Sequence, residues 1–332
     1  MCHTTQLRNF DMRPVTVVPR LIVLLAWFFA ALQTAYSEMR PWAARGGRPV
    51  QAELVAFDPG TKKVTLKLAT GTQTVVAFDA LSDADQAYLT ERQRKIDESI
   101  AAAKANAGKI VDYQSDGAEA VAYHVYFPTN YNPASPPAML IMFSPGGAGK
   151  GILGSVKDAC ETLGWIGVGC DAFRNNADES GLDKKWREVL PHIEKTVPHN
   201  ADLLFLGGMS GGALRAYDYS ESTARPWKGV LALGGWLAGK ATLHCAPKMA
   251  VAIVNGASDK GANSNALLDE KVLRAAHCTV KMFSFPGGHQ VAPPPVILQA
   301  MQWLKEATMP GNRVSAGKRS PTPRDPDLSK VK

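Results

Sequence analysis

The chain has 332 residues, of which 45% are hydrophobic and 20% charged, as in an ordinary globular protein. This length accommodates one large α/β domain and a smaller unit, and the composition excludes a wholly disordered chain. The formal net charge of +7 is concentrated at the ends, because residues 1–37 carry a net +2 and residues 311–332 a net +4. The body is close to neutral, at about +1, so nucleic acid is not an expected partner.

Residues 1–37 have the three parts of a secretory signal peptide. Arg13 and Arg20 form a basic region, residues 21–32 (LIVLLAWFFAAL) an apolar one, and residues 35–37 supply small side chains for cleavage. The apolar run is shorter than the roughly 20 residues that span a bilayer. We therefore expect a secreted or periplasmic protein with no stable membrane span after cleavage; an uncleaved anchor is the alternative.

Residues 39–90 predict a small β unit. Three β-rich runs, VQAELVAFD (50–58), KKVTLKLAT (62–70) and TQTVVAFDAL (72–81), are separated by turn sequences and followed by a short helix capped by Ser82. The order and spacing of RPW (40–42), AELVAFD, VTLKLATG and LSDADQAYL resemble the Sla homology domain, a small SH3-like barrel. The resemblance implies a binding or attachment module, here for a cell-envelope ligand; a structural barrel without a ligand is the alternative.

A polar, helix-forming linker at 91–109 leads into a longer α/β region at 110–308. There, apolar runs typical of buried strands alternate with helical segments, which predicts a mostly parallel sheet covered by helices on both faces. The expected strands are 120–128, 138–147, 165–171, 202–210, 229–236, 249–259 and 279–289, and the expected helices 151–163, 183–196, 211–222, 265–276 and 296–307. Residues 309–332 are rich in Pro, Ser and charge, and predict a disordered basic tail.

The segment FLGGMSGGAL, residues 205–214, contains a G-x-S-x-G pattern centred on Ser210. It lies between a predicted strand and a predicted helix, where such a pattern forms a nucleophile elbow that exposes the serine hydroxyl. Glycine two positions before and after the serine, Gly208 and Gly212, lets the strand and helix pass closely. Ser210 is therefore the candidate nucleophile.

A serine nucleophile needs a base, and the base needs an acid that orients it. Asp259 follows the strand predicted at 249–255, and His289 follows the strand predicted at 280–285. Both therefore lie at the same sheet edge as Ser210, in the chain order Ser, Asp, His that this architecture uses. We predict that Asp259 and His289 complete a catalytic triad.

The oxyanion of an acyl-transfer intermediate needs N–H donors. The backbone of Gly211, directly after the candidate nucleophile, is one expected donor. The turn FSPGGAGKG, residues 143–151, is placed to supply the other, with Gly147 as the first choice and Gly146 as the alternative. A phosphate-binding loop is excluded by spacing, because Lys150 is followed by glycine.

Taken together, these motifs make residues 110–308 resemble the α/β-hydrolase family, especially its compact exported esterases. The resemblance implies a serine hydrolase that cleaves a small-molecule or polymer-linked carboxylic ester through an acyl-enzyme, with no metal or organic cofactor. One departure is Pro145-Gly146, where family members often carry His-Gly. The alternatives are a peptidase or acyltransferase with the same triad, and a non-catalytic cell-envelope binding protein.

Two further expectations concern the surroundings of the site. Phe173 and Trp236 follow predicted strands, and we expect them to line the substrate pocket. An exported chain that loses Cys2 keeps four cysteines, enough for two disulfides. A Cys245–Cys278 bridge is favoured over a Cys160–Cys170 bridge, because Cys245 and Cys278 each precede a predicted strand.

Overall fold

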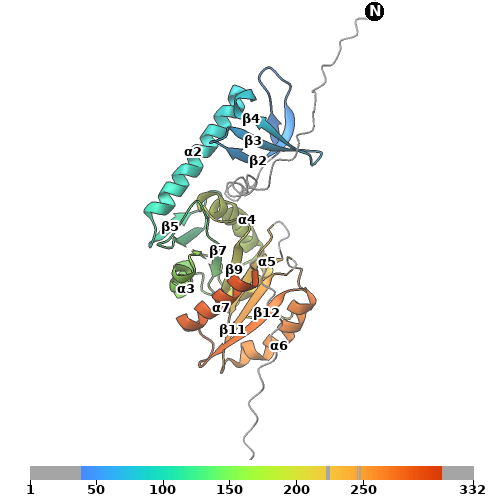
Figure 1. Cartoon of the computed structure of the whole chain (residues 1–332). Coiled ribbons are helices and arrows are strands. Elements are labelled where there is room, and N and C mark those ends of the chain that lie inside the picture. The colour runs from blue at the N-terminus through green and yellow to red at the C-terminus, as the bar shows by residue number, and fades with distance from the viewer. Residues whose placement is uncertain (1–38, 222–224, 245, 247, 309–332) are drawn as a thin grey trace, which may run out of the picture.

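The computed structural model describes residues 39–221, 225–244, 246 and 248–308 (Figure 1). The predicted signal peptide, the predicted basic tail and Cys245 lie outside the described residues. Within the described ranges, no helix combines the length and the apolar character needed to cross a membrane.

The first described unit is a four-stranded antiparallel sheet in the order β1-β2-β3-β4. Its strands are β1 (Arg40–Trp42), β2 (Val50–Asp58), β3 (Lys63–Leu68) and β4 (Gln73–Ala77). The turn between β2 and β3 forms at Asp58, whose carboxylate accepts the N–H groups of Gly60 and Thr61. Trp42, Leu54 and neighbouring apolar side chains form a core separate from that of the larger unit.

After β4, the chain passes through a single 3₁₀ turn, η1 (Phe78–Ala80). It then pairs with residues 43–45, which directly follow β1. The N–H of Arg45 donates to Ala80 O at 3.0 Å, and the N–H of Ser82 donates to Ala43 O at 2.8 Å. No pair between β1 and β4 themselves occurs among the described strands. The SH3-like barrel stays a prediction.

Helix α2 (Asp83–Ala105) connects the two units. It begins at Ser82, whose hydroxyl accepts the N–H of Asp85 at 3.2 Å, and it continues for 23 residues. The short helix after Ser82 and the linker helix at 91–109 are therefore one element with no break near residue 90. Leu89 is buried in the core of the first unit, and Ala103 in the core of the second.

The larger unit is built on an eight-stranded sheet in the order β12-β11-β10-β9-β7-β8-β6-β5. The strands are β5 (Ile110–Gln114), β6 (Ala122–Tyr126), β7 (Met139–Phe143), β8 (Ile166–Cys170), β9 (Leu204–Met209), β10 (Gly229–Leu233), β11 (Ala250–Gly256) and β12 (Thr279–Phe285). Strands β7 to β12 are parallel, and β5 and β6 are antiparallel at one edge. The mostly parallel sheet agrees with the prediction, whereas strand β5 was not predicted.

Helices cover both faces of this sheet (Figure 1). They are α3 (Gly149–Leu163), α4 (Glu179–Thr196), α5 (Gly211–Ser220), α6 (Lys260–Ala275) and α7 (Pro294–Thr308). Apolar side chains of α3 and α7 pack on one face, and those of α4, α5 and α6 on the other. All residues of β7 to β11 are buried, as expected of strands covered on both sides. The architecture fits the α/β-hydrolase fold.

The predicted Cys160–Cys170 bridge is wrong. Both are buried free thiols, and they pack into the cores on opposite faces of the sheet, so their sulfur atoms cannot meet. Cys278 is also buried, and no disulfide forms among the described residues. The Cys245–Cys278 pairing stays a prediction, because Cys245 lies outside them.

Candidate active site

Ser210 lies in the tight turn between β9 and α5. Its backbone has φ 53° and ψ −121°, a conformation that side-chain-bearing residues rarely adopt and that stores local strain. The N–H of Ser210 donates to Leu233 O at 2.8 Å, which fastens the turn to the neighbouring strand β10. The geometry is that of a nucleophile elbow, with the hydroxyl presented at the carboxyl edge of the sheet.

The glycines on either side of Ser210 are required by the close approach of backbone segments. A Cβ atom on Gly208 would lie 2.4 Å from Gly212 O, and a Cβ on Gly212 would lie 2.1 Å from Phe143 O. Both distances are far below van der Waals contact, and both clashing atoms are backbone atoms. Strand β9, helix α5 and strand β7 therefore meet this closely only because both positions are glycine.

A chain of hydrogen bonds joins the three predicted residues. His289 Nε2 lies 2.8 Å from Ser210 Oγ, and His289 Nδ1 lies 2.7 Å from Asp259 Oδ2. Because a carboxylate only accepts, Nδ1 carries the proton toward Asp259, and Nε2 is left to accept from the serine hydroxyl. The imidazole is thus oriented to take the proton of Ser210.

Asp259 is buried, at 4% exposure, and caps the N-terminus of α6 by accepting the N–H of Ala262 at 3.1 Å. Burial alone raises the pKa of Asp259, but the hydrogen bonds from His289 and from the N–H groups at the start of α6 outweigh it. The pKa therefore lies below its ordinary value. Asp259 is ionised at neutral pH, which favours the orientation of His289 described above.

The loops that carry the acid and the base are bonded to each other through the main chain. The N–H of Ala257 donates to Phe285 O and the N–H of Ser258 donates to Gly287 O, both at 2.8 Å. A Cβ on Gly256 would lie 2.3 Å from Gly288 O, so glycine is needed for the two loops to pack. The separation of Asp259 and His289 is therefore fixed by backbone contacts.

Among the described residues, two of the predicted oxyanion donors have an N–H group without a backbone acceptor. We find no backbone acceptor for the N–H of Gly211 in the described ranges, as expected at a helix N-terminus. The N–H of Gly146 has only a 3.3 Å contact with Ser144 Oγ, whereas the N–H of Gly147 donates to Ser144 O at 3.0 Å within a turn. This difference favours the alternative, Gly146, over the first choice, Gly147, and both stay predictions.

The two aromatic residues expected in the pocket have different positions. Phe173 is only 2% exposed and packs edge-on against Phe143, at 5.1 Å between ring centroids, so its expected place in the pocket is wrong. The reason is the left-handed turn at Ala172, with φ 72°, after which Phe173 points into the core. Trp236 is half-buried and follows Gly235, which lies against the backbone of Ser210, so it stays a candidate.

Two features near the site were not predicted from the sequence. The side chain of Asn175, in the loop after β8, lies against Gly211. In addition, His124 lies 2.7 Å from an Asp112 oxygen and 3.2 Å from an Asp171 oxygen, and Asp171 accepts the N–H of Gly149 at 2.6 Å. The His124, Asp112 and Asp171 side chains thus anchor the start of α3. This start lies in the turn of residues 143–151 that carries the predicted donors Gly146 and Gly147, here called the oxyanion turn. The available signal was a series of polar residues after β8, at the same edge as Ser210.

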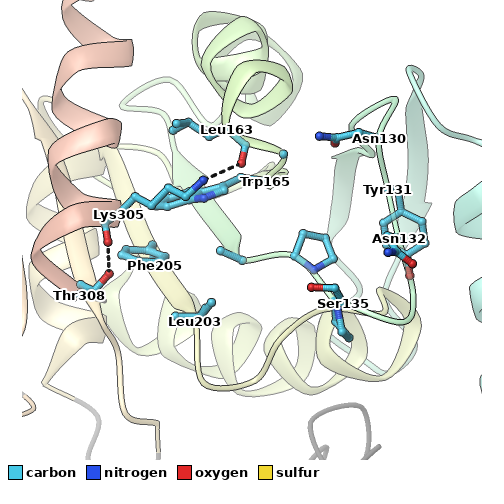
Figure 2. A pocket seen from close by; sticks show the side chains of 14 residues that line it. Asn130, Tyr131, Asn132, Ser135, Leu163, Trp165, Leu203, Phe205, Lys305 and Thr308 are labelled. Atoms are coloured by element: carbon cyan, nitrogen blue, oxygen red, sulfur yellow. Dashed lines mark hydrogen bonds between the residues drawn. The ribbon is translucent and has the colours of Figure 1, made fainter. Parts of the chain in front are cut away.

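A separate pocket of about 360 Å³ lies at the opposite end of the sheet (Figure 2). Its lining includes Trp165 and Leu203, which directly precede β8 and β9, whereas Ser210 follows β9. The stacked rings of Trp165 and Phe205 form part of its wall, and Lys305 Nζ donates to Leu163 O at 3.4 Å. None of the three hydrogen-bonded residues of the candidate site lines it.

In the described part of the chain, no group of three or more His, Cys, Asp or Glu side chains is arranged to hold a metal ion. The chemistry that the arrangement itself supports is proton transfer from a hydroxyl to an imidazole beside N–H donors.

No family model and no curated protein matches this chain. Similar solved structures include an S-formylglutathione hydrolase from Agrobacterium tumefaciens, with a TM-score of 0.48, 13% identity, and coverage of 60% of this chain and 95% of that one. A ferulic acid esterase has a TM-score of 0.47, 18% identity, and coverage of 60% and 97%. FphF, a fluorophosphonate-binding serine hydrolase from Staphylococcus aureus, has a TM-score of 0.47, 12% identity, and coverage of 60% and 98%. The likeness concerns the fold and says nothing of the substrate.

Proposed function

We propose that this chain is an exported serine hydrolase that cleaves carboxylic esters through an acyl-enzyme. The observation that carries the proposal is the hydrogen-bonded series Ser210–His289–Asp259, with the serine held in a strained turn. A serine in this setting has the base, the orienting acid and the exposure that nucleophilic catalysis needs.

In the proposed reaction, Ser210 Oγ attacks the ester carbonyl carbon while His289 Nε2 takes the hydroxyl proton. The N–H groups of Gly211 and Gly146 bind the oxyanion of the tetrahedral intermediate. When that intermediate collapses, the protonated His289 gives its proton to the leaving alcohol, and an acyl-serine forms. Water, deprotonated by His289, then attacks the acyl-serine and releases the acid. Asp259 stabilises the imidazolium in both steps.

The base of the proposed reaction is accessible, because the side chain of His289 is 44% exposed. An open site of this kind admits a small-molecule ester or an ester linked to a polymer. A peptidase or an acyltransferase would use the same three residues, and assays with peptides or with an added alcohol acceptor distinguish these reactions.

Export and attachment belong to the same proposal. The basic and apolar segments of residues 1–37 support secretion or delivery to the periplasm. The hydrogen bonds between residues 80–82, after η1, and residues 43–45, after β1, support an SH3-like unit. We propose that this unit binds a cell-envelope ligand. If this unit alone carried the function, the chain would bind the envelope without hydrolysing esters.

Hydrolysis of short p-nitrophenyl esters by the purified chain tests the proposal. We expect turnover by wild type, loss of at least about 10³-fold in kcat for Ser210→Ala, and a comparable loss for His289→Ala. Ser99→Ala is the matched control, because Ser99 lies half-buried on α2 and, among the described residues, its hydroxyl donates only to Lys95 O. Equal rates for wild type and Ser210→Ala would contradict the assignment, as would fluorophosphonate labelling that His289→Ala leaves undiminished.

A further inference from the structure

A side-chain amide occupies the space beside the residue that follows the candidate nucleophile. A Cβ atom built on Gly211 would lie 1.8 Å from Asn175 Oδ1 and 2.9 Å from Asn175 Nδ2. The amide is therefore packed over the first residue of α5, Gly211, whose N–H is an expected oxyanion donor. This contact also explains why the position after Ser210 is glycine, since any side chain there would displace Asn175.

The backbone holds Asn175 at this place. Its N–H donates to Pro145 O at 2.9 Å, and the N–H of Ala172 donates to Gly147 O at 3.2 Å. The loop after β8 is thus bonded at two points to the oxyanion turn. Ala172 and Asn176, on either side of Asn175, both have left-handed backbone, with φ 72° and 59°. Strained residues held by surrounding bonds are typical of pre-organised sites.

The amide of Asn175 has unused hydrogen-bonding capacity. The residue is exposed, and among the described residues its side chain makes no hydrogen bond. An asparagine side chain carries two N–H donors, and rotation of the amide turns Nδ2 toward a partner. At the same time, the N–H of Gly147, one of the expected oxyanion donors, is used within its own turn.

We propose that Asn175 is a catalytic residue whose Nδ2 donates a hydrogen bond to the oxyanion, beside the N–H groups of Gly211 and Gly146. The inference rests on the proposed function, because an oxyanion forms only if Ser210 attacks a carbonyl. A donor aimed at charge that develops in the transition state lowers the barrier without tightening substrate binding. Its removal therefore lowers kcat and leaves KM nearly unchanged.

The test compares Asn175→Ala and Asn175→Asp with wild type in steady-state ester hydrolysis. For one side-chain oxyanion donor the loss in kcat is about 10²-fold. We expect that loss in Asn175→Ala with KM within about threefold, and at least the same loss in Asn175→Asp, whose carboxylate repels the oxyanion. Asn130→Ala is the matched control: Asn130 is an exposed asparagine that packs on Gly164 by its amide, at the other end of the sheet.

Gly211→Ala provides an independent measurement, because its methyl group displaces the Asn175 amide while the backbone N–H of residue 211 remains. We expect its loss in kcat to equal that of Asn175→Ala, and the double variant to lose no more than either single variant. A kcat within twofold of wild type in Asn175→Ala would overturn the role of Asn175 alone. Equal activity of wild type and Ser210→Ala would instead overturn the proposed function.

Discussion

The substitution Gly212→Ala should push apart helix α5 and strand β7, which meet beside Ser210. Gly212 is the second residue of α5, and its Cα faces the end of β7. A methyl group there would lie 2.1 Å from Phe143 O and 3.1 Å from Ser144 N. Since ordinary van der Waals contact begins at about 3.4 Å, helix α5 and strand β7 must move apart by roughly 1 Å, because neither atom belongs to a flexible side chain.

The expected magnitude follows from that displacement. Forcing extra volume into a close-packed interior costs about 1–3 kcal/mol, partly offset by the roughly 1 kcal/mol that alanine gains over glycine in a helix. Misplacing reacting groups by 1 Å costs about 10²-fold in rate. We therefore expect Gly212→Ala to be destabilised by up to about 2 kcal/mol and to lose about 10²-fold in kcat.

The measurements are urea unfolding and p-nitrophenyl ester hydrolysis. The matched control is Gly154→Ala, another helical glycine, whose built Cβ meets nothing within 4 Å. We expect this control to be stabilised by up to about 1 kcal/mol with unchanged kcat. If Gly212→Ala were as stable and as active as Gly154→Ala, β7 and α5 would not lie as close as described, and the reasoning would be refuted.

Three further predictions concern the cysteines and Asp259. Because burial raises the pKa of Cys160 to about 12 and also raises that of Cys170, both thiols should resist a water-soluble disulfide reagent in the native chain and react in urea; rapid native labelling would contradict their burial. In the same preparation, a mass increase on reduction that Cys245→Ser abolishes would support the Cys245–Cys278 bridge. The lowered pKa of Asp259 means that its ionised form contributes stability above the pKa of an exposed aspartate, about 3.9, and that this contribution is lost as the pH falls through the lower folded pKa. Urea unfolding between pH 2.5 and 5 should therefore show a weaker pH dependence in Asp259→Asn, and an unchanged dependence would refute the linkage.

The position of Ser210 could be predicted because the signal is local. The glycines at 208 and 212, an apolar strand before them and a helix after them leave few other conformations for the serine. Asp259 and His289 could be predicted because the carboxyl ends of parallel strands meet at one edge. In both cases, the pattern of strands determines which residues come near each other.

The loop after β8 could not be predicted in this way. Phe173 and Asn175 are two residues apart, and the aromatic one was expected in the pocket. The backbone of Ala172 decides which of them faces the site, and a left-handed alanine has no sequence signal. The choice between Gly146 and Gly147 likewise depends on a turn hydrogen bond that residue types do not encode.

The Cys160–Cys170 pairing was wrong for a different reason. Cys160 and Cys170 are close in sequence, but one lies on a helix above the sheet and the other faces the layer below it. Strand β5 was missed because it is a short edge strand without an apolar run, and it is identified only through its pairing with β6.

Helix α2 determines the separation between the N-terminal unit and the larger unit. Its first turns are anchored by Leu89 in one core and its last by Ala103 in the other, and at 1.5 Å per residue its 23 residues extend about 35 Å (Figure 1). A helical connection of this kind acts as a spacer with a preferred length, unlike a flexible chain whose ends sample many separations. If the N-terminal unit binds a surface, as proposed, substrates on that surface would lie within a narrow range of distances from the serine, which would raise their local concentration there.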